Sequence, residues 1–243
     1  MIKSICIIGQ GNVGTHLCVA FAGKIEELYS IDSRTLEDLP IDADLYIISV
    51  SDDAIREVSS RLPQINGVVA HTSGSTSLDA LDGINGKRGV FYPLMTFSKD
   101  SAIEYQKIPV FIEGSDTEAV SVLNEAANLF TTKVMQMNSS QRIKMHIASV
   151  FACNFVNSLW VAASDILKEE NVPFSYFLPL IEATAEKLHY LSPEEAQTGP
   201  AKRGDMNIID KQEQMLFDKP ELQKIYRDLS QLIISQTSKK NSN

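Results

Sequence analysis

The sequence predicts an α/β protein with a doubly wound, mostly parallel sheet in its first half and an all-α second half. Two observations lead to this fold class. Short apolar runs alternate with helix-like segments through the first half, which is typical of a parallel sheet with helices on both faces. From residue 139 onward, apolar residues instead recur every three or four positions, which is helical spacing.

The sheet is predicted from its β-rich apolar runs. They cover residues 2–8, 28–31, 45–50, 68–71, 90–92 and 110–112. The segments between them that have helical character are 12–22, 53–62 and 116–130. This order of strands and helices predicts a first domain over residues 1–138.

The second domain is predicted over residues 139–243 and is entirely helical. Helices are expected at 139–170, at 175–191 and from residue 220, with a capping box at 192–195. Pro173 separates the first two helices, and Asp218 and Pro220 mark the start of the last. The polar end from Gln236 to Asn243 is expected to fray.

Composition excludes several classes of partner. The formal net charge of −9 argues against binding to nucleic acid or to an anionic membrane, which need clustered cations. We find no stretch of roughly 20 apolar residues that would span a bilayer. Three widely spaced cysteines indicate reduced thiols and a cytoplasmic protein. The four histidines lie far apart in the sequence, so no metal site is expected.

A glycine-rich turn follows the first apolar run. Gly9, Gly11 and Gly14 have the spacing at which the first glycine makes a tight turn, the second lets a pyrophosphate approach the backbone, and the third lets helix and strand pack closely. The alternative is a purely structural turn. We predict a Rossmann domain that binds a dinucleotide through residues Gly9, Gln10, Gly11, Asn12, Val13 and Gly14.

The choice between NADP and NAD depends on the end of the second strand. Asp32 suits the ribose hydroxyls of NAD, whereas Ser33, Arg34 and Thr35 offer a guanidinium and two hydroxyls to the 2′-phosphate of NADP. We favour NADP, with NAD possible. The alternative is that Arg34 only pairs with a nearby acid, either Glu37 or Asp38.

Polar residues also follow the next three strands, where ligands bind in such sheets. Ser49, Val50 and Ser51 are expected to line the cofactor, whereas Asp53 reads as a helix N-terminal acid. The residues at and after the end of the strand at 68–71 offer hydroxyls and backbone donors to a substrate carboxylate or phosphate. They are His71, Thr72, Ser73, Gly74 and Ser75. An ordinary Ser-rich turn explains it equally well. Residues 92–97, which include Thr96, could form a second wall of the cleft.

Five motifs together resemble a known family. They are GQGNVG at 9–14, HTSGS at 71–75, PLMTF at 93–97, MHIASVFACNF at 145–155 and TGPAKRGD at 198–205. The chain is similar to bacterial Rossmann-like proteins with a helical C-terminal domain of unknown function, distant relatives of pyrroline-5-carboxylate reductase and of 6-phosphogluconate and 3-hydroxyisobutyrate dehydrogenases. This resemblance implies an NADP-dependent oxidoreductase fold. It also implies that the second domain resembles that of 6-phosphogluconate dehydrogenase and mediates a homodimer.

One departure from the dehydrogenase relatives concerns catalysis. Those enzymes carry a catalytic Lys three or four residues before an Asn on the first long helix of the second domain. If that Asn corresponds to Asn154, the Lys position falls on Val150 or Phe151, so the Lys is absent. His146 lies one turn earlier and could exchange a proton with a substrate. Alternatively, it is a packed helix residue. Ser73 and Asn154 are the other candidate catalytic residues.

The TGPAKRGD segment adds candidate substrate ligands. Arg203 is expected to bind an anionic group of the substrate, with Asp205 orienting Arg203 or capping the next helix. A structural pair between the two is the alternative. The sequence as a whole predicts hydride transfer between NADPH and a small anionic carbonyl, imine or hydroxy acid. A sensor that binds NADP without turnover is the rival hypothesis.

Overall fold

The computed structural model describes residues 1–99 and 101–240. Contacts between Cα atoms divide the chain into two compact units, Met1–Phe155 and Val156–Asn243. The predicted boundary at residues 138 and 139 coincides with the start of a helix that groups with the sheet. That domain boundary stays a prediction.

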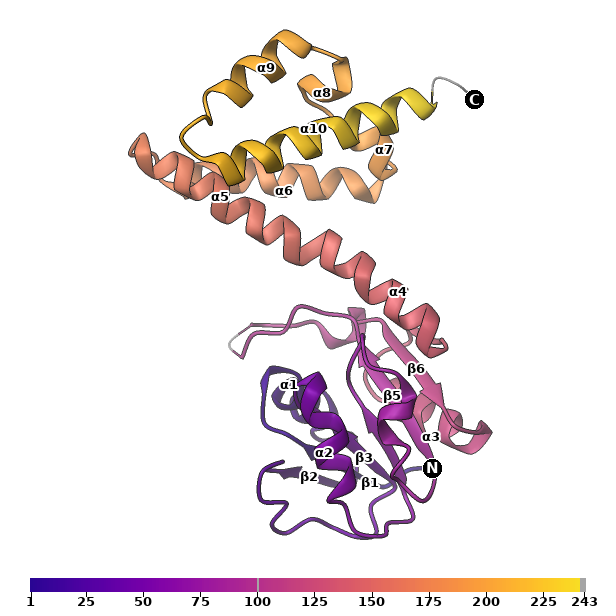
Figure 1. The fold of residues 1–243 in the computed structure, drawn as a ribbon. Coiled ribbons are helices and arrows are strands. Elements are labelled where there is room, and N and C mark those ends of the chain that lie inside the picture. Colours follow the sequence, from indigo (N-terminus) through magenta and orange to yellow (C-terminus); the bar gives the residue numbers. More distant parts are fainter. Residues whose placement is uncertain (100, 241–243) are drawn as a thin grey trace. The chain divides into compact units, whose positions relative to one another are not determined.

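The first unit contains a seven-stranded sheet (Figure 1). Its strands are β1 (Ser4–Ile8), β2 (Glu27–Ile31), β3 (Leu45–Ile48), β4 (Val68–His71), β5 (Arg88–Pro93), β6 (Val110–Gly114) and β7 (Val134–Gln136). They are ordered β2-β1-β3-β4-β5-β6-β7, and all neighbours are parallel except β5 and β6. The predicted α/β fold with a doubly wound sheet is thus confirmed. The short strand β7 was not predicted.

Side chains that alternate along the strands supply the two apolar layers of the first unit. Ile5 and Ile7 of β1 pack in the layer covered by helices α1 (Asn12–Phe21) and α3 (Thr117–Asn128). Cys6 and Ile8 pack in the opposite layer, under α2 (Ile55–Ser60) and the 3₁₀ turn η2 (Leu78–Leu81). Because both faces of β1 and β3 are buried, these strands are continuous apolar runs rather than alternating ones.

The remaining short elements of the first unit are the 3₁₀ turns η1 (Asp52–Ala54) and η3 (Tyr105–Lys107). Asp53 lies in the first turn of η1, as predicted for a helix N-terminal acid. The long helix predicted over 139–170 is present as one continuous run, Ser139–Glu169. It consists of α4 (Ser139–Ser149), a π-helical turn η4 (Val150–Asn154) and α5 (Phe155–Glu169), and the π-helical turn was not predicted.

The second unit is helical. After α5 it contains η5 (Phe174–Phe177), α6 (Leu178–Glu186), η6 (Lys187–His189), α7 (Pro193–Ala196), α8 (Pro200–Arg203), α9 (Met206–Gln214) and α10 (Pro220–Lys240). The capping box at Ser192 and Glu195 is formed as predicted. Fraying was predicted from Gln236 to Asn243. This prediction was wrong for residues 236–240, because α10 continues to Lys240, and residues 241–243 lie outside the described residues.

The second unit leaves most of its apolar surface uncovered. Among its described side chains, only Ala201, Ile209 and Ser230 are buried. The continuous helix Ser139–Glu169 is long and apolar enough to cross a membrane by length and composition. That finding corrects the expectation that no segment approaches this length, although a soluble core helix meets the same criterion.

Candidate functional site

The glycine-rich turn joins β1 to α1 and presses against β3. Gly9 has a φ of +114°, and a Cβ atom there would lie 2.2 Å from the backbone oxygen of Ser49. A Cβ atom on Gly14 would lie 2.0 Å from the backbone oxygen of Gly9. Neither position accepts a side chain, so both glycines are required for the strand and helix to approach this closely.

Gly11 differs from these two glycines because it faces open space. A Cβ atom built there meets nothing within 4 Å. Gly11 is also the N-cap of α1. Among the described residues, no side chain forms a capping hydrogen bond there, and the first turn of α1 contains no acidic residue. The first backbone N–H groups of α1 therefore lack helical partners beside an exposed backbone, an arrangement that suits an anion such as phosphate.

These features border a cleft of about 470 Å³ at the carboxyl ends of the parallel strands. It lies where β2 and β3 diverge on the two sides of β1, which is the ligand-binding crevice of such sheets. Its lining consists of Gly9, Gln10, Gly11, Asn12, Val13, Ser33, Ser49, Val50, Ser51, Ala54 and Thr72. Most predicted cofactor residues are thus brought together; Gly14, Arg34 and Thr35 are outside the lining.

Arg34 pairs with Asp32 rather than with Glu37 or Asp38. Its Nε lies 3.0 Å from Oδ1 of Asp32, and its backbone N–H donates to the same oxygen at 2.9 Å. These hydrogen bonds lower the pKa of Asp32 to about 2. The Arg34 side chain remains 85% exposed, so the guanidinium keeps access to solvent at the edge of the cleft. Asp32 and Arg34, the two residues that could select between NAD and NADP, are therefore paired with each other.

Arg61, which was not predicted, lies against the same loop. It follows α2, and its guanidinium donates to the backbone oxygens of Ser33 at 3.2 Å and Arg34 at 2.6 Å. These bonds fix the course of the loop that carries the predicted 2′-phosphate ligands. No local sequence signal could have found Arg61, because it lies 27 residues beyond Arg34.

His71, a predicted substrate ligand, is fully buried at the end of β4. Its Nδ1 accepts from the backbone N–H of Ser73 at 3.1 Å, and its Nε2 lies 3.3 Å from the backbone oxygen of Ser77. Burial lowers the pKa of His71 to about 4, so the ring is neutral and Nε2 carries the proton. Its observed role is to hold the turn, and direct contact with a substrate stays a prediction.

Ser73 is similarly engaged within the turn. Its hydroxyl oxygen accepts from the backbone N–H groups of Ser75 at 3.1 Å and Thr76 at 2.9 Å, which is the capping pattern of a Ser-rich turn. The neighbouring hydroxyl of Ser75 donates to Asp52. The catalytic role predicted for Ser73 stays a prediction, because its observed contacts are all structural.

His146 meets this turn together with Tyr92, which was not singled out from the sequence. The Tyr92 hydroxyl lies 3.1 Å from Nδ1 of His146, and the two rings meet edge to face with centroids 6.0 Å apart. A Cβ atom on Gly74 would lie 2.7 Å from that Nδ1 and 2.6 Å from Cζ of Tyr92. Only a glycine lets the turn, the end of β5 and α4 converge at this point.

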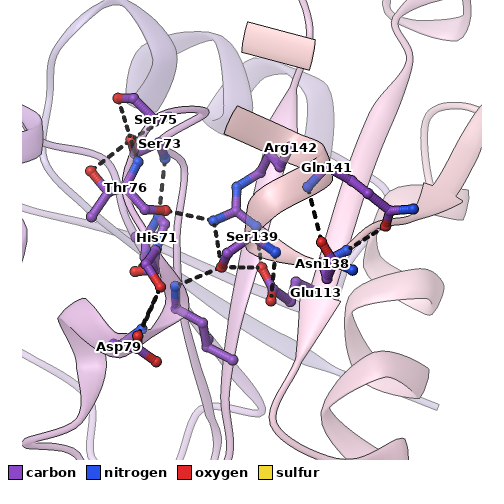
Figure 2. Close-up of polar contacts among 12 residues, drawn as sticks. His71, Ser73, Ser75, Thr76, Asp79, Glu113, Asn138, Ser139, Gln141 and Arg142 are labelled. Atoms are coloured by element: carbon purple, nitrogen blue, oxygen red, sulfur yellow. Dashed lines mark hydrogen bonds and ion pairs between the residues drawn. The ribbon is translucent and has the colours of Figure 1, made fainter. Parts of the chain in front are cut away.

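A buried ion pair fixes α4 in this position, as Figure 2 shows. The Arg142 side chain is 1% exposed and pairs with Glu113 of β6. Arg142 also donates to the backbone oxygen of Thr76 at 2.5 Å. The hydroxyl of Ser139 donates to Glu113 at 2.8 Å and accepts from the backbone N–H of Leu78 at 3.1 Å. Arg142 precedes His146 by one helical turn, so one anchored helix face carries both residues.

The other predicted residues are less closely tied to this region. Thr96 is exposed, but its segment is held near the glycine turn because Asn12 donates to the backbone oxygen of Phe97 at 3.1 Å. Asn154 is exposed in the π-helical turn, a feature often found at functional sites. In residues 1–99 and 101–240, no cluster of His, Cys, Asp or Glu side chains has a metal-binding arrangement.

Arg203 and Asp205 belong to the helical unit. Arg203 is exposed at the end of α8, and the side chain of Asp205 caps α9 by accepting from the backbone N–H of Ile208 at 3.4 Å. The described ion pairs include none between these two residues. The capping role considered for Asp205 is therefore present, whereas the Arg203–Asp205 pair is not.

The strand order and the cleft at its switch point define a Rossmann-type protein with a helical C-terminal region. More specifically, the chain belongs to the family described as "Domain of unknown function (DUF2520)", whose model matches residues 108–233, just over half of the 243 residues. The family resemblance expected from the motifs is thus confirmed. A comparison with curated proteins finds no match.

Solved structures support this assignment. The chain is 34% identical to the "putative NADP oxidoreductase" BF3122 from Bacteroides fragilis, with a TM-score of 0.86 over 96% of this chain and 98% of that one. It also resembles protein TM1727 from Thermotoga maritima, at 20% identity and a TM-score of 0.77 over 98% and 99%. For the pyrroline carboxylate reductase of Plasmodium falciparum, solved with NADP bound, the values are 11% and 0.58 over 97% of both chains. The last two show the fold alone.

Proposed function

We propose that this protein is an oxidoreductase that transfers hydride between NADPH and a small anionic carbonyl, imine or hydroxy acid. The observation that carries this proposal is the cleft at the switch point, with Gly11 open to it and the N-terminus of α1 beside it. The 34% identity with a Bacteroides fragilis protein described as an NADP oxidoreductase supports the same activity.

The cleft residues fit a dinucleotide. The N–H groups at the start of α1 would hold the pyrophosphate, and Ser49, Val50 and Ser51 at the end of β3 would line the route toward the nicotinamide. When bound, NADPH supplies the hydride. The protein contributes a shaped cleft and fixed backbone donors.

NADP is the proposed cofactor because cations lie at the ribose end of the cleft. Arg34 is exposed, and Arg61 holds the backbone of the loop formed by Ser33 and Arg34. A 2′-phosphate would compete with the carboxylate of Asp32 for the guanidinium of Arg34. NAD remains the alternative cofactor, because Asp32 could instead accept from ribose hydroxyls.

His146 is the proposed proton-exchanging residue, and the substrate is proposed to be a small anionic metabolite. His146 is half-buried, and among the described residues no hydrogen bond engages its Nε2. Arg203 is proposed to bind an anionic group, since its guanidinium is exposed and enters no described ion pair. An Arg side chain can pair with a carboxylate through two parallel hydrogen bonds, which adds binding energy and fixes the orientation of the ligand.

The helical unit is proposed to form a homodimer. Its exposed apolar side chains include Trp160 and Val161 on α5, Leu180 on α6 and Leu229 on α10. A surface of this kind is typical of an interface between subunits. We place the protein in the cytoplasm and assign this surface to a second copy of the chain rather than to a membrane.

Cofactor binding tests the proposal most directly. In a fluorescence titration, NADPH is expected to bind at least tenfold more tightly than NADH. Arg34→Ala should weaken NADPH by about tenfold or more while changing NADH little, because a charged hydrogen bond to the phosphate contributes about 1.5–3 kcal/mol. Arg227→Ala, which removes an exposed Arg that pairs with Glu213 in the helical unit, is the matched control.

Nucleotide binding and turnover together distinguish the oxidoreductase from the sensor that binds NADP without turnover. A protein that binds neither nucleotide contradicts both the enzyme and the sensor. A protein that binds NADPH but oxidises it with no keto acid or cyclic imine is the sensor. An equal loss of NADPH and NADH affinity in Arg34→Ala would contradict the phosphate-binding role of Arg34.

A further inference from the structure

The hydroxyl of Tyr92 has two polar neighbours, His146 and Ser149. Nδ1 of His146 lies 3.1 Å away, and the hydroxyl of Ser149 is the second neighbour. Ser149 donates its own proton to the backbone oxygen of His146 at 2.7 Å. The Tyr92 hydroxyl has one proton to donate, and we take Nδ1 of His146, the neighbour whose distance to it is 3.1 Å, as its acceptor.

Burial keeps Tyr92 protonated, because it raises the pKa of the phenol above its usual value. A neutral imidazole has one donor and one acceptor nitrogen. If Nδ1 accepts from Tyr92, the ring proton must lie on Nε2, the nitrogen that has no hydrogen bond within the described part of the chain.

From this geometry we infer that Tyr92 is a positioning residue that fixes His146 with its proton on Nε2, so that Nε2–H can donate to the oxygen or nitrogen of the substrate. This inference rests on the proposed oxidoreductase function and adds to it the residue that prepares the proton donor. The pair is held from both sides, since Gly74 allows the turn to pack against it and Arg142 anchors the same helix.

The protons balance along this pair. During reduction, hydride adds to the substrate carbon and the Nε2 proton passes to the substrate oxygen or nitrogen. In the same step Nδ1 takes the Tyr92 proton and the Tyr92 oxygen takes a proton from solvent, so no phenolate is left and the net proton consumed comes from solvent.

Tyr92→Phe tests the inference because it removes only the hydroxyl and keeps the ring beside Phe111 and His146. We expect kcat to fall by about tenfold to a hundredfold, within the range of general acid catalysis, with the Kd for NADPH unchanged. Tyr29→Phe is the control; it removes an exposed hydroxyl that donates to Glu27 at 2.7 Å. An unchanged kcat in Tyr92→Phe overturns the inference.

A second measurement needs neither turnover nor NADPH. In protein labelled with ¹⁵N at histidine, the His146 signals are identified by their loss in His146→Ala, and their shifts report which nitrogen carries the proton. We expect the Nε2–H tautomer in the wild type and a mixture of tautomers in Tyr92→Phe. A wild-type protein with the proton on Nδ1 overturns the inference. Because this readout is independent of the cofactor, failure of the proposed function is distinguished from failure of the Tyr92 role.

Discussion

At the residue scale, the surroundings of a histidine decide what it can do. His71 and His146 both lie next to the turn of residues 71–76, but His71 has no exposed surface and both of its nitrogens are engaged. His146 is half-buried and has one engaged nitrogen. The observed contacts of His71 are therefore structural, whereas His146 keeps the nitrogen that the proposed proton exchange requires.

The lowered pKa of His71 predicts that stability falls with acid. Between pH 6.5 and pH 4 the unfolded chain binds a proton that the folded chain excludes, so stability rises with pH through this window. Its contribution is fully present above the window and is lost as pH falls through it. We expect the pH 7 to pH 5 change in unfolding free energy to be about 2 kcal/mol smaller in His71→Asn than in the wild type.

Urea unfolding at the two pH values measures this difference. Asn keeps an acceptor for the Ser73 N–H group but does not titrate. His189→Asn, at an exposed position of the helical unit, controls for the loss of an imidazole. The same pH response in wild type and His71→Asn would refute the prediction.

At the element scale, α4 depends on the ion pair between Glu113 and Arg142. Removing Arg142 leaves the carboxylate of Glu113, which is only 15% exposed, without its cation. We expect Arg142→Met to lower the free energy of unfolding by about 3–5 kcal/mol, because it leaves the buried carboxylate of Glu113 without a compensating positive charge. Circular dichroism during urea unfolding measures the change.

The control for this prediction is Arg227→Met. Arg227 pairs with Glu213 at the surface of the helical unit, with 47% of its side chain exposed. Its loss should cost under about 1 kcal/mol, since solvent screens such pairs. Equal costs in the two variants would show that Glu113 is not held by Arg142.

The sequence predicted the elements in proportion to their length and periodicity. The long helix Ser139–Glu169 was found because its apolar spacing is uninterrupted. Strand β7 has three residues, two of them exposed, so it has no periodic apolar signal. Helix α9 is short, with nine residues, and its apolar side chains lie in its first turn, so its pattern is brief. The π-helical turn η4 was not predicted because no Gly or Pro interrupts the helical pattern there.

At the scale of the whole molecule, the helical unit exposes apolar side chains, and we propose that a second copy of the chain covers them. We expect light scattering to show a dimer at micromolar concentration. The double substitution Val161→Glu and Leu180→Glu should shift the protein toward monomer, because it places charges on side chains that are 55% and 61% exposed in the single chain. Ile41→Glu, at a 64% exposed position in the first unit, is the control.

A wild-type protein that is monomeric at this concentration would contradict the dimer. Binding to lipid vesicles by the wild type, with loss in the double variant, would assign the apolar surface to a membrane instead. Neither measurement involves NADPH, so neither result bears on the proposed oxidoreductase activity, which the cofactor titration tests separately.

The sequence by itself determined the local features of this protein: the glycine turn, the alternating strands and helices, the capping box and the family motifs. These depend on neighbours in the chain, so spacing reveals them. Only the tertiary structure decided that Arg34 faces Asp32, that Arg61 holds the same loop, and that Tyr92, Gly74 and His146 meet. Residues from β5, the turn after β4 and α4 are brought together by sheet order and helix packing, which no local pattern specifies.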